Sequence, residues 1–588
     1  MTPTIKATAV LLLFLVAVLF SETVMAQSPA DETQTAPATG AITGRVSEGG
    51  RPVPNATVIV RGSSPFAQPR LTATDNEGNF QVNDLPAELY IVSASAPGYV
   101  TPPRDDGPMA FTRIGESLDL SMVKGGVITG SVTSPTGEPA VQIAVRAIMI
   151  KDASGQPPRF PPNQAFRVTD DRGIYRLYGL QPGTYLVAAG GRGSFGVSSG
   201  AYDFDVPTYA PSSTRDTASE ITVRAGDEMT GVDIRYRGDS GRVVTGVVTG
   251  LVEQSQPGPG SPTINMLQIS NGVPLGTSST FQMPGGRGFT FYGVADGDYE
   301  LTAQLFLGPG ESLVSESRRI SVKGGDVTGI ELALKPLASI GGKVTFEAST
   351  APECKNKRRP LISETMIAAR RSEKGIPKDQ LRPMAYFVAQ GSPNKSGEFV
   401  LRNLRPGPYN LNTRFFAKYW YLNSITRDAP SGGPATAKTG PANRQTDLAR
   451  NQLNLKTGER VFGVTISLAE GAASLRGTIK LEAGQTVPAR LYVHLVPSEK
   501  ERLDDVLRVF AARVNADGTF ALNNLPPGRY WAVARVAQES ETDMSARVRM
   551  PDEGELRTQI KRAAEAGKAA VAFQPCQNVT DYQLGSPR

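Results

Sequence analysis

The chain is poor in the residues from which metal and catalytic sites are most often built. It contains one histidine, His494, and two cysteines, Cys354 and Cys576, among 588 residues. A zinc site built on paired histidines is therefore excluded, and the two cysteines lack the close spacing of a paired-cysteine zinc site. A serine–histidine–carboxylate triad would need His494, which lies in the alternating segment 491–496, where we expect a structural histidine in a strand.

Other signatures of catalysis are also missing. No Gly-x-Gly-x-x-Gly sequence follows a strand and opens a helix, so no dinucleotide site is indicated. Acidic residues at turns, such as Asp75 and Asp170, offer two or three oxygen ligands where calcium needs six to eight, and a turn residue explains them without a metal. We therefore expect no enzyme, no cofactor and no metal.

Long hydrophobic runs are absent as well. The longest, residues 9–20, falls short of the roughly 20 residues that a membrane-spanning helix needs. Lys6 precedes this run and the small-residue segment 24–26 follows it, which is the pattern of a cleaved signal peptide over residues 1–26. A flexible leader, 27–40, comes next. We expect a secreted protein, periplasmic or extracellular, without a transmembrane anchor.

The charge is modest for so long a chain. The net charge is +6, and the basic cluster at 355–359 has no interleaved aromatic residues, so no nucleic-acid partner is expected. Glycine (61) and proline (45) are abundant, while charged residues make up 20% and hydrophobic residues 39%. This composition is typical of a turn-rich β protein.

One stretch, residues 517–530, recurs in recognisable form four more times. Each copy ends on a tyrosine, with an aromatic residue ten positions upstream, a branched aliphatic residue five upstream and, in four copies, glycine two upstream. The tyrosines are Tyr90, Tyr185, Tyr299, Tyr409 and Tyr530. Such fixed spacing predicts a repeat array, with Asp or Asn and glycine at the tight turns between strands.

Strand patterns surround each copy. A β-branched run interrupted by glycine, such as 41–46, opens it and indicates a bulge or a close backbone approach. Late pairs such as 320–322 and 330–332 look like hairpins. About seven short strands per copy predict an all-β fold, a tandem array of five antiparallel β-sandwiches. The expected domains are 41–124, 125–238, 239–336, 337–470 and 471–588, with helices over 499–510 and 555–566 in the last.

The repeat resembles the carboxypeptidase regulatory-like domains, which are transthyretin-like or prealbumin-like β-sandwiches of exported bacterial proteins. The resemblance rests on the Gly-x-Val opening, the Pro-x-Pro-x-Ala-x-Val strand of the first copy, the Asp-x-x-Gly-x-Phe turn and the Leu-x-Pro-Gly-x-Tyr close. The third copy departs from it at Pro284 and Arg287, and the fourth has a long middle segment over 350–392. The resemblance implies an accessory module without catalytic residues, related to folds that bind carbohydrate.

The best candidate for ligand binding is the aromatic stretch 415–421, in particular Phe416, Tyr419, Trp420 and Tyr421. These rings could stack on sugar rings if exposed. Because side chains alternate along a strand, the other interpretation is that one set packs in the core. A weaker candidate is the group Tyr202, Phe204 and Tyr209, where exposed rings would favour ligand binding.

Two functions remain open at this point. The first is a non-catalytic array that binds carbohydrate or another cell-envelope polymer, with avidity from several weak sites. The alternative is a structural or protein-interaction scaffold, or an adhesin, with no small ligand. Cys354 and Cys576 belong to different expected domains and could form a disulfide that joins the fourth to the fifth, provided that their Cα atoms lie within about 7 Å.

Overall fold

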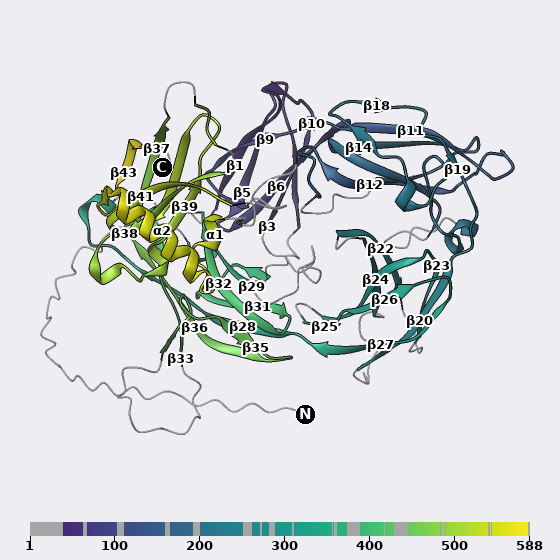
Figure 1. Ribbon diagram of the computed structural model, residues 1–588. Helices are drawn as coiled ribbons and strands as arrows, with labels where there is room; N and C mark the ends of the chain where they lie inside the picture. Colours follow the sequence, from purple (N-terminus) through teal and green to yellow (C-terminus); the bar gives the residue numbers. More distant parts are fainter. Residues whose placement is uncertain are drawn as a thin grey trace, which may run out of the picture.

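The protein is an array of β-sandwiches, seen in a computed structural model (Figure 1). The structure describes residues 39–62, 68–102, 111–158, 165–191, 200–250, 262–270, 273–281, 288–308, 311–355, 357, 361–372, 389–416, 418–428, 445–481, 485–488, 490–538, 541 and 544–585. The expected signal peptide and nearly all of the leader lie outside this set. Within it, no helix has the length and apolar character needed to cross a membrane.

The same topology recurs five times. In each sandwich one sheet holds the first strand between an antiparallel neighbour and the last strand, which runs parallel to it; the facing sheet is antiparallel.

In sandwich 1 the first sheet is β5 (Asn79–Pro86), β1 (Thr39–Glu48) and β9 (Ser117–Ser121), with β2 (Arg51–Pro52), and the second is β4 (Arg70–Ala73), β3 (Thr57–Gly62), β6 (Leu89–Ser95) and β8 (Phe111–Arg113). The short strands β7 (Tyr99–Val100) and β10 (Val123–Lys124) pair with each other. In sandwich 2 the first sheet is β14 (Ile174–Leu180), β11 (Gly126–Thr133), β18 (Glu228–Met229) and β19 (Ile234–Arg235). The second sheet is β13 (Ala165–Val168), β12 (Ala144–Asp152), β15 (Gly183–Ala189), β16 (Thr208–Tyr209) and β17 (Ile221–Val223). Two 3-10 turns, η2 (Gly200–Phe204) and η3 (Arg215–Thr217), lie in the connections.

In sandwich 3 the sheets are β23 (Gly288–Val294), β20 (Arg242–Thr249) and β27 (Val327–Pro336), and β22 (Val273–Phe281), β21 (Thr263–Ser270), β24 (Gly297–Gly308) and β26 (Arg318–Val322); β25 (Glu311–Ser315) links β24 to β27. Sandwich 4 has β31 (Glu398–Leu404), β28 (Ala338–Glu347), β36 (Arg460–Glu470), β33 (Trp420–Asp428) and β34 (Gln445–Asp447) facing β30 (Ala389–Gly391), β29 (Thr365–Arg371), β32 (Gly407–Phe415) and β35 (Leu453–Leu455), with turns η4 (Pro352–Cys354) and η5 (Ile362–Glu364).

Sandwich 5 has β40 (Thr519–Leu525), β37 (Ala473–Lys480) and β43 (Asn578–Gly585) facing β39 (Phe510–Arg513), β38 (Leu491–Pro497), β41 (Gly528–Val536) and β42 (Ala569–Phe573). It also carries the turns η8 (Lys500–Arg502) and η9 (Val506–Arg508) and the helices α1 (Met544–Arg547) and α2 (Gly554–Gly567).

The opening glycine of each copy faces the first aromatic of its repeat across the sheet. The pairs are Gly44 with Phe80, Gly130 with Tyr175, Gly246 with Phe289, Gly342 with Phe399 and Gly477 with Phe520. A Cβ on any of these glycines would lie 2.0–2.4 Å from a backbone carbonyl oxygen. In four sandwiches this oxygen belongs to the parallel last strand, and in sandwich 2 it belongs to Val232, between the parallel strands β18 and β19. The close approach predicted from the sequence is confirmed, and so is the bulge, a shift in register about two to four residues before each glycine.

The tyrosine that ends each repeat is part of the core. All five are at most 5% exposed. Four donate the hydroxyl to the backbone carbonyl four residues earlier, at 2.7–2.8 Å: Tyr90, Tyr185, Tyr299 and Tyr530. A buried hydroxyl needs a hydrogen-bond partner. In these four copies, the bond that satisfies the tyrosine hydroxyl therefore also fixes the loop before the tyrosine.

Two predictions about secondary structure are wrong. The late strands do not form hairpins: β26 pairs with β24 in one sheet, whereas β27 pairs with β20 in the other. The connecting segment crosses between sheets because the last strand fills the free edge of the first strand. Residues 499–510 do not form one helix either. The Asp505 side chain accepts the Leu507 N–H at 3.1 Å and caps a new short turn, and Phe510 then enters β39.

The second helix is confirmed as α2. Figure 1 shows α2 against the sheet that contains β38 and β41. Its buried residues Leu556, Ile560 and Ala564 pack, together with Met544 of α1, on the outer face of this sheet. This sheet is therefore buried on both sides.

The array bends back on itself, so that sandwich 4 contacts sandwich 1 (Figure 1). The buried Glu364 pairs with Arg113 at 3.6 Å, and the Phe111 and Phe416 rings meet edge to face with centroids 6.0 Å apart. Ser363 also donates to the carbonyl of Ala87 at 3.1 Å. Contacts between residues so distant in sequence give a compact frame instead of an extended rod.

Candidate functional site

The aromatic stretch 415–421 lies where sandwiches 1, 4 and 5 meet; Ala417 is outside the described residues. Phe416 is partly buried against Phe111 of sandwich 1. Trp420 is 3% exposed in the core of sandwich 4, edge to face with Phe346 at 4.7 Å between centroids. Its ring therefore packs within the protein, as alternation along β33 allows.

Tyr419 and Tyr421 are partly exposed. The Tyr419 hydroxyl accepts a hydrogen bond from Asn578 at 3.3 Å, and its carbonyl accepts the N–H of Gly471 at 2.8 Å. Burial raises the pKa of the Tyr421 hydroxyl. The charged groups that act on this hydroxyl come from both sandwiches: Glu347 from sandwich 4, and Arg502, Asp505 and Arg508 from sandwich 5.

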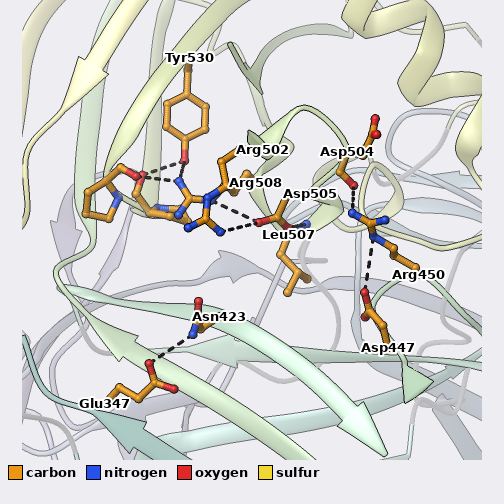
Figure 2. Close-up of polar contacts among 12 residues, drawn as sticks. Glu347, Asn423, Asp447, Arg450, Arg502, Asp504, Asp505, Leu507, Arg508 and Tyr530 are labelled. Atoms are coloured by element: carbon orange, nitrogen blue, oxygen red, sulfur yellow. Dashed lines mark hydrogen bonds and ion pairs between the residues drawn. The ribbon is translucent and has the colours of Figure 1, made fainter. Parts of the chain in front are cut away.

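A disulfide fixes this junction. Cys354 and Cys576 are bonded, with Cα atoms 5.4 Å apart and both residues 5% exposed. The disulfide that the sequence left possible is therefore present. Across the same junction, Asn524 of sandwich 5 donates to the Trp420 carbonyl at 2.7 Å. Arg450 of sandwich 4 donates to the Asp504 carbonyl at 3.0 Å (Figure 2).

An open cleft of about 340 Å³ lies in sandwich 5 beside the disulfide. Its lining comes from three segments: the insertion after β38, the turn that enters β41, and the end of β42. The lining residues are Glu499, Arg502, Arg508, Pro527, Gly528, Arg529, Ala572, Phe573, Gln574 and Pro575. Three arginines against one glutamate make it basic.

Arg508 is the buried centre of the cleft wall, and Figure 2 shows its guanidinium between Asp505 and Tyr530. Nε lies 3.3 Å from the Asp505 carboxylate, and Nη1 donates to the Pro527 carbonyl at 2.7 Å and contacts the Tyr530 hydroxyl at 3.4 Å. A Cβ on Gly528, whose φ is +142°, would approach Nη1 to 3.1 Å. The repeat glycine of the fifth copy therefore leaves room for this arginine.

The sequence did not indicate a site in the insertion that carries Arg502 and Arg508, because the pattern over 499–510 predicts a helix there. Its signal is that only the fifth copy places basic residues between the second strand and the glycine turn at this spacing. The arginines face Gly528 and Arg529, which sit 20 or more residues later, so only tertiary structure brings them together.

The three residues of the weaker candidate group, Tyr202, Phe204 and Tyr209, lie in three different environments. Tyr209 is 7% exposed, Tyr202 packs edge to face on Tyr236 at 5.4 Å, and Phe204 is 57% exposed and meets Tyr292 of sandwich 3 at 5.3 Å between centroids. Phe204 and the 42% exposed Tyr292 therefore form an exposed aromatic pair between sandwiches 2 and 3.

His494 is fully buried between the sheet and the helices of sandwich 5. It pairs through β38 with Ala511 and Val533, and neither ring nitrogen has a hydrogen-bond partner among the described residues. No group of three or more His, Cys, Asp or Glu side chains in the described part of the chain could hold a metal ion.

Comparison with known proteins identifies the first sandwich. Residues 41–106 match the family model of the carboxypeptidase regulatory-like domain. The first sandwich is a carboxypeptidase regulatory-like domain. The other four share its strand pairing and its glycine–aromatic register, so carboxypeptidase regulatory-like architecture recurs along the chain. No curated protein matches the chain.

Solved structures of low similarity include the Bacillus anthracis TIE protein, at 14% identity and a TM-score of 0.14, covering 51% of each chain. The minor pilin GBS52 of Streptococcus agalactiae is 13% identical, with a TM-score of 0.18, over 34% of this chain and 96% of the pilin. BcpA, the major pilin subunit of Bacillus cereus, is 8% identical, with a TM-score of 0.13, over 50% of this chain and 99% of the pilin. The chain thus spans about half the length of the B. anthracis protein, and likeness at this level says nothing about its function.

Proposed function

We propose that this protein is an exported, non-catalytic binding protein for a polysaccharide or other polymer of the cell envelope. The observation that carries the proposal is the open, arginine-lined cleft of sandwich 5, with the partly exposed Tyr421 in electrostatic contact with two of its arginines. Polymer binding needs an accessible concave surface with a few polar groups and an aromatic neighbour, and this junction offers them.

Export and the absence of catalysis are parts of the same proposal. Support for export comes from the signal-peptide pattern over residues 1–26 and from the disulfide, which persists in oxidising compartments. The non-catalytic role is supported by the buried position of the one histidine and by the match of the first sandwich to the carboxypeptidase regulatory-like domain.

The test is a glycan and polysaccharide screen on the mature protein, followed by affinity electrophoresis of variants. Tyr421→Ala should weaken retention by a polysaccharide that binds the wild type, because it removes an aromatic ring whose hydroxyl interacts electrostatically with two arginines of the cleft. Tyr178→Ala, at a 54% exposed tyrosine on the outer face of sandwich 2, is the matched control and should migrate like the wild type. No retention of the wild type by any polymer, or equal retention of Tyr421→Ala and the wild type, would refute the proposal. Trp420→Ala is unsuitable because the ring supports the core.

A scaffold or adhesin is the second candidate. The observation in its favour is the compact frame, in which the disulfide joins sandwich 5 to sandwich 4 and the Arg113–Glu364 pair joins sandwich 4 to sandwich 1. Affinity capture from the native envelope distinguishes the two: a protein partner recovered at stoichiometric yield favours the scaffold.

A further inference from the structure

The cleft carries positive charge that the protein does not neutralise through close contacts. Arg502 is half exposed, and its nearest acidic contact is Asp505 at 3.9 Å. Arg529 is 75% exposed, and its Nε lies 3.8 Å from Glu499. Both separations exceed hydrogen-bond length, and neither guanidinium donates a hydrogen bond to a described residue.

Arg508 adds a third guanidinium to the cleft, and its position is fixed by contacts within the protein. Its side chain is 10% exposed, and Nε and Nη1 are held by Asp505 and by the Pro527 carbonyl. Nη2 has no partner within the described ranges, although the residue lines the cleft. Nη2 is accessible at the cleft wall, so it can donate a hydrogen bond to a ligand that supplies an acceptor.

We propose that the cleft binds an acidic group, a carboxylate or a phosphate, carried by a saccharide unit of the envelope polymer. Arg502 and Arg529 reach the oxyanion from two sides, and Arg508 donates from the floor. Arginine suits this role because its planar fork donates two parallel hydrogen bonds to carboxylate or phosphate oxygens. Glu499 keeps Arg529 in place, since its carboxylate accepts the Arg529 backbone N–H at 3.0 Å.

This inference rests on the proposed function and specifies its ligand. The experiment is isothermal titration calorimetry of the full mature chain with polygalacturonate and with its fully methyl-esterified form, which keeps the sugar backbone and removes the charge. The wild type should bind the acid polymer and bind the ester at least about tenfold more weakly, as charge-assisted hydrogen bonds predict.

The decisive variant is Arg502→Gln with Arg529→Gln, which should weaken binding of the acid polymer by about 10- to 100-fold. The control is Arg476→Gln with Arg562→Gln, at two exposed arginines of the same sandwich outside the cleft lining. It changes the net charge by the same amount, so it should bind like the wild type, and circular dichroism checks that both double variants stay folded.

Competition identifies which acidic group is recognised. Displacement of the polymer by inorganic phosphate, but not by acetate, assigns the site to phosphate; displacement by acetate assigns it to carboxylate. Equal affinity for the acid and the ester, or equal losses in the two double variants, overturns the inference. If neutral polymers bind without a preference for charge, the proposed function stands and the inference falls, whereas if no polymer in the screen binds, both fall.

Discussion

The single histidine provides a direct test of the packing in sandwich 5. His494 is fully buried beside the ion pair of Arg535 and Glu541, whose charged atoms are 2.8 Å apart. Burial, with a smaller contribution from the Arg535 charge, lowers the pKa of His494 from its ordinary 6.5 to about 4, while the Glu541 charge acts in the opposite direction. The imidazole should therefore stay neutral in the folded protein at pH values where a free histidine is charged.

The sign of the pH dependence follows from linkage. Since the folded state holds the neutral form, the unfolded chain binds the proton more readily, so this contribution to stability is complete above pH 6.5 and is lost as the pH falls towards 4. The shift corresponds to about 3 kcal/mol between these limits. His494→Leu removes the titrating group and two buried nitrogens without partners, so it should equal or exceed the wild type in stability at pH 7.

Two measurements check this. Because the chain has one histidine, the ring resonances in an NMR titration report His494 alone, provided that no histidine tag is present. Urea unfolding monitored by tryptophan fluorescence, at several pH values between 7 and 4, should show the wild type losing stability relative to His494→Leu. A histidine that titrates near 6.5, or two proteins whose stabilities fall in parallel, would contradict the assigned environment.

Two further predictions concern the scaffold. Gly477→Ala should destabilise sandwich 5 by about 2 kcal/mol or more, because its Cβ would lie 2.4 Å from a carbonyl oxygen of the parallel strand. The control, Gly567→Ala, has open space around the added Cβ and should be neutral or slightly stabilising. Equal melting temperatures of the two variants would contradict this prediction. A free-thiol count on the unfolded, unreduced protein should find none, and replacing Cys354 and Cys576 by alanine should cost about 3–5 kcal/mol of unfolding free energy in denaturant titrations, since the bond closes a loop of 222 residues; two free thiols would exclude it.

The repeat shows how much of the candidate site could be predicted locally. Its spacing predicted the strands, the turns and the buried aromatic positions, and the aromatic stretch 415–421 lies at the junction of sandwiches 4 and 5. It could not distinguish the buried Trp420, which packs on Phe346, from the partly exposed Tyr421. Side chains of neighbouring residues in a strand point to opposite faces of the sheet. Which of the two faces becomes the core depends on the elements that pack against it.

By itself, the sequence determined the five-fold sandwich architecture and the positions of the repeat glycines and aromatics, because turn chemistry and side-chain periodicity act over a few residues. Only the tertiary structure decided that the last strand runs parallel to the first, that residues 499–510 break into turns, and that Arg508 lies against Gly528 in a basic cleft. These features depend on which distant strands share an edge and which side chains meet across it, and no local pattern encodes such a choice.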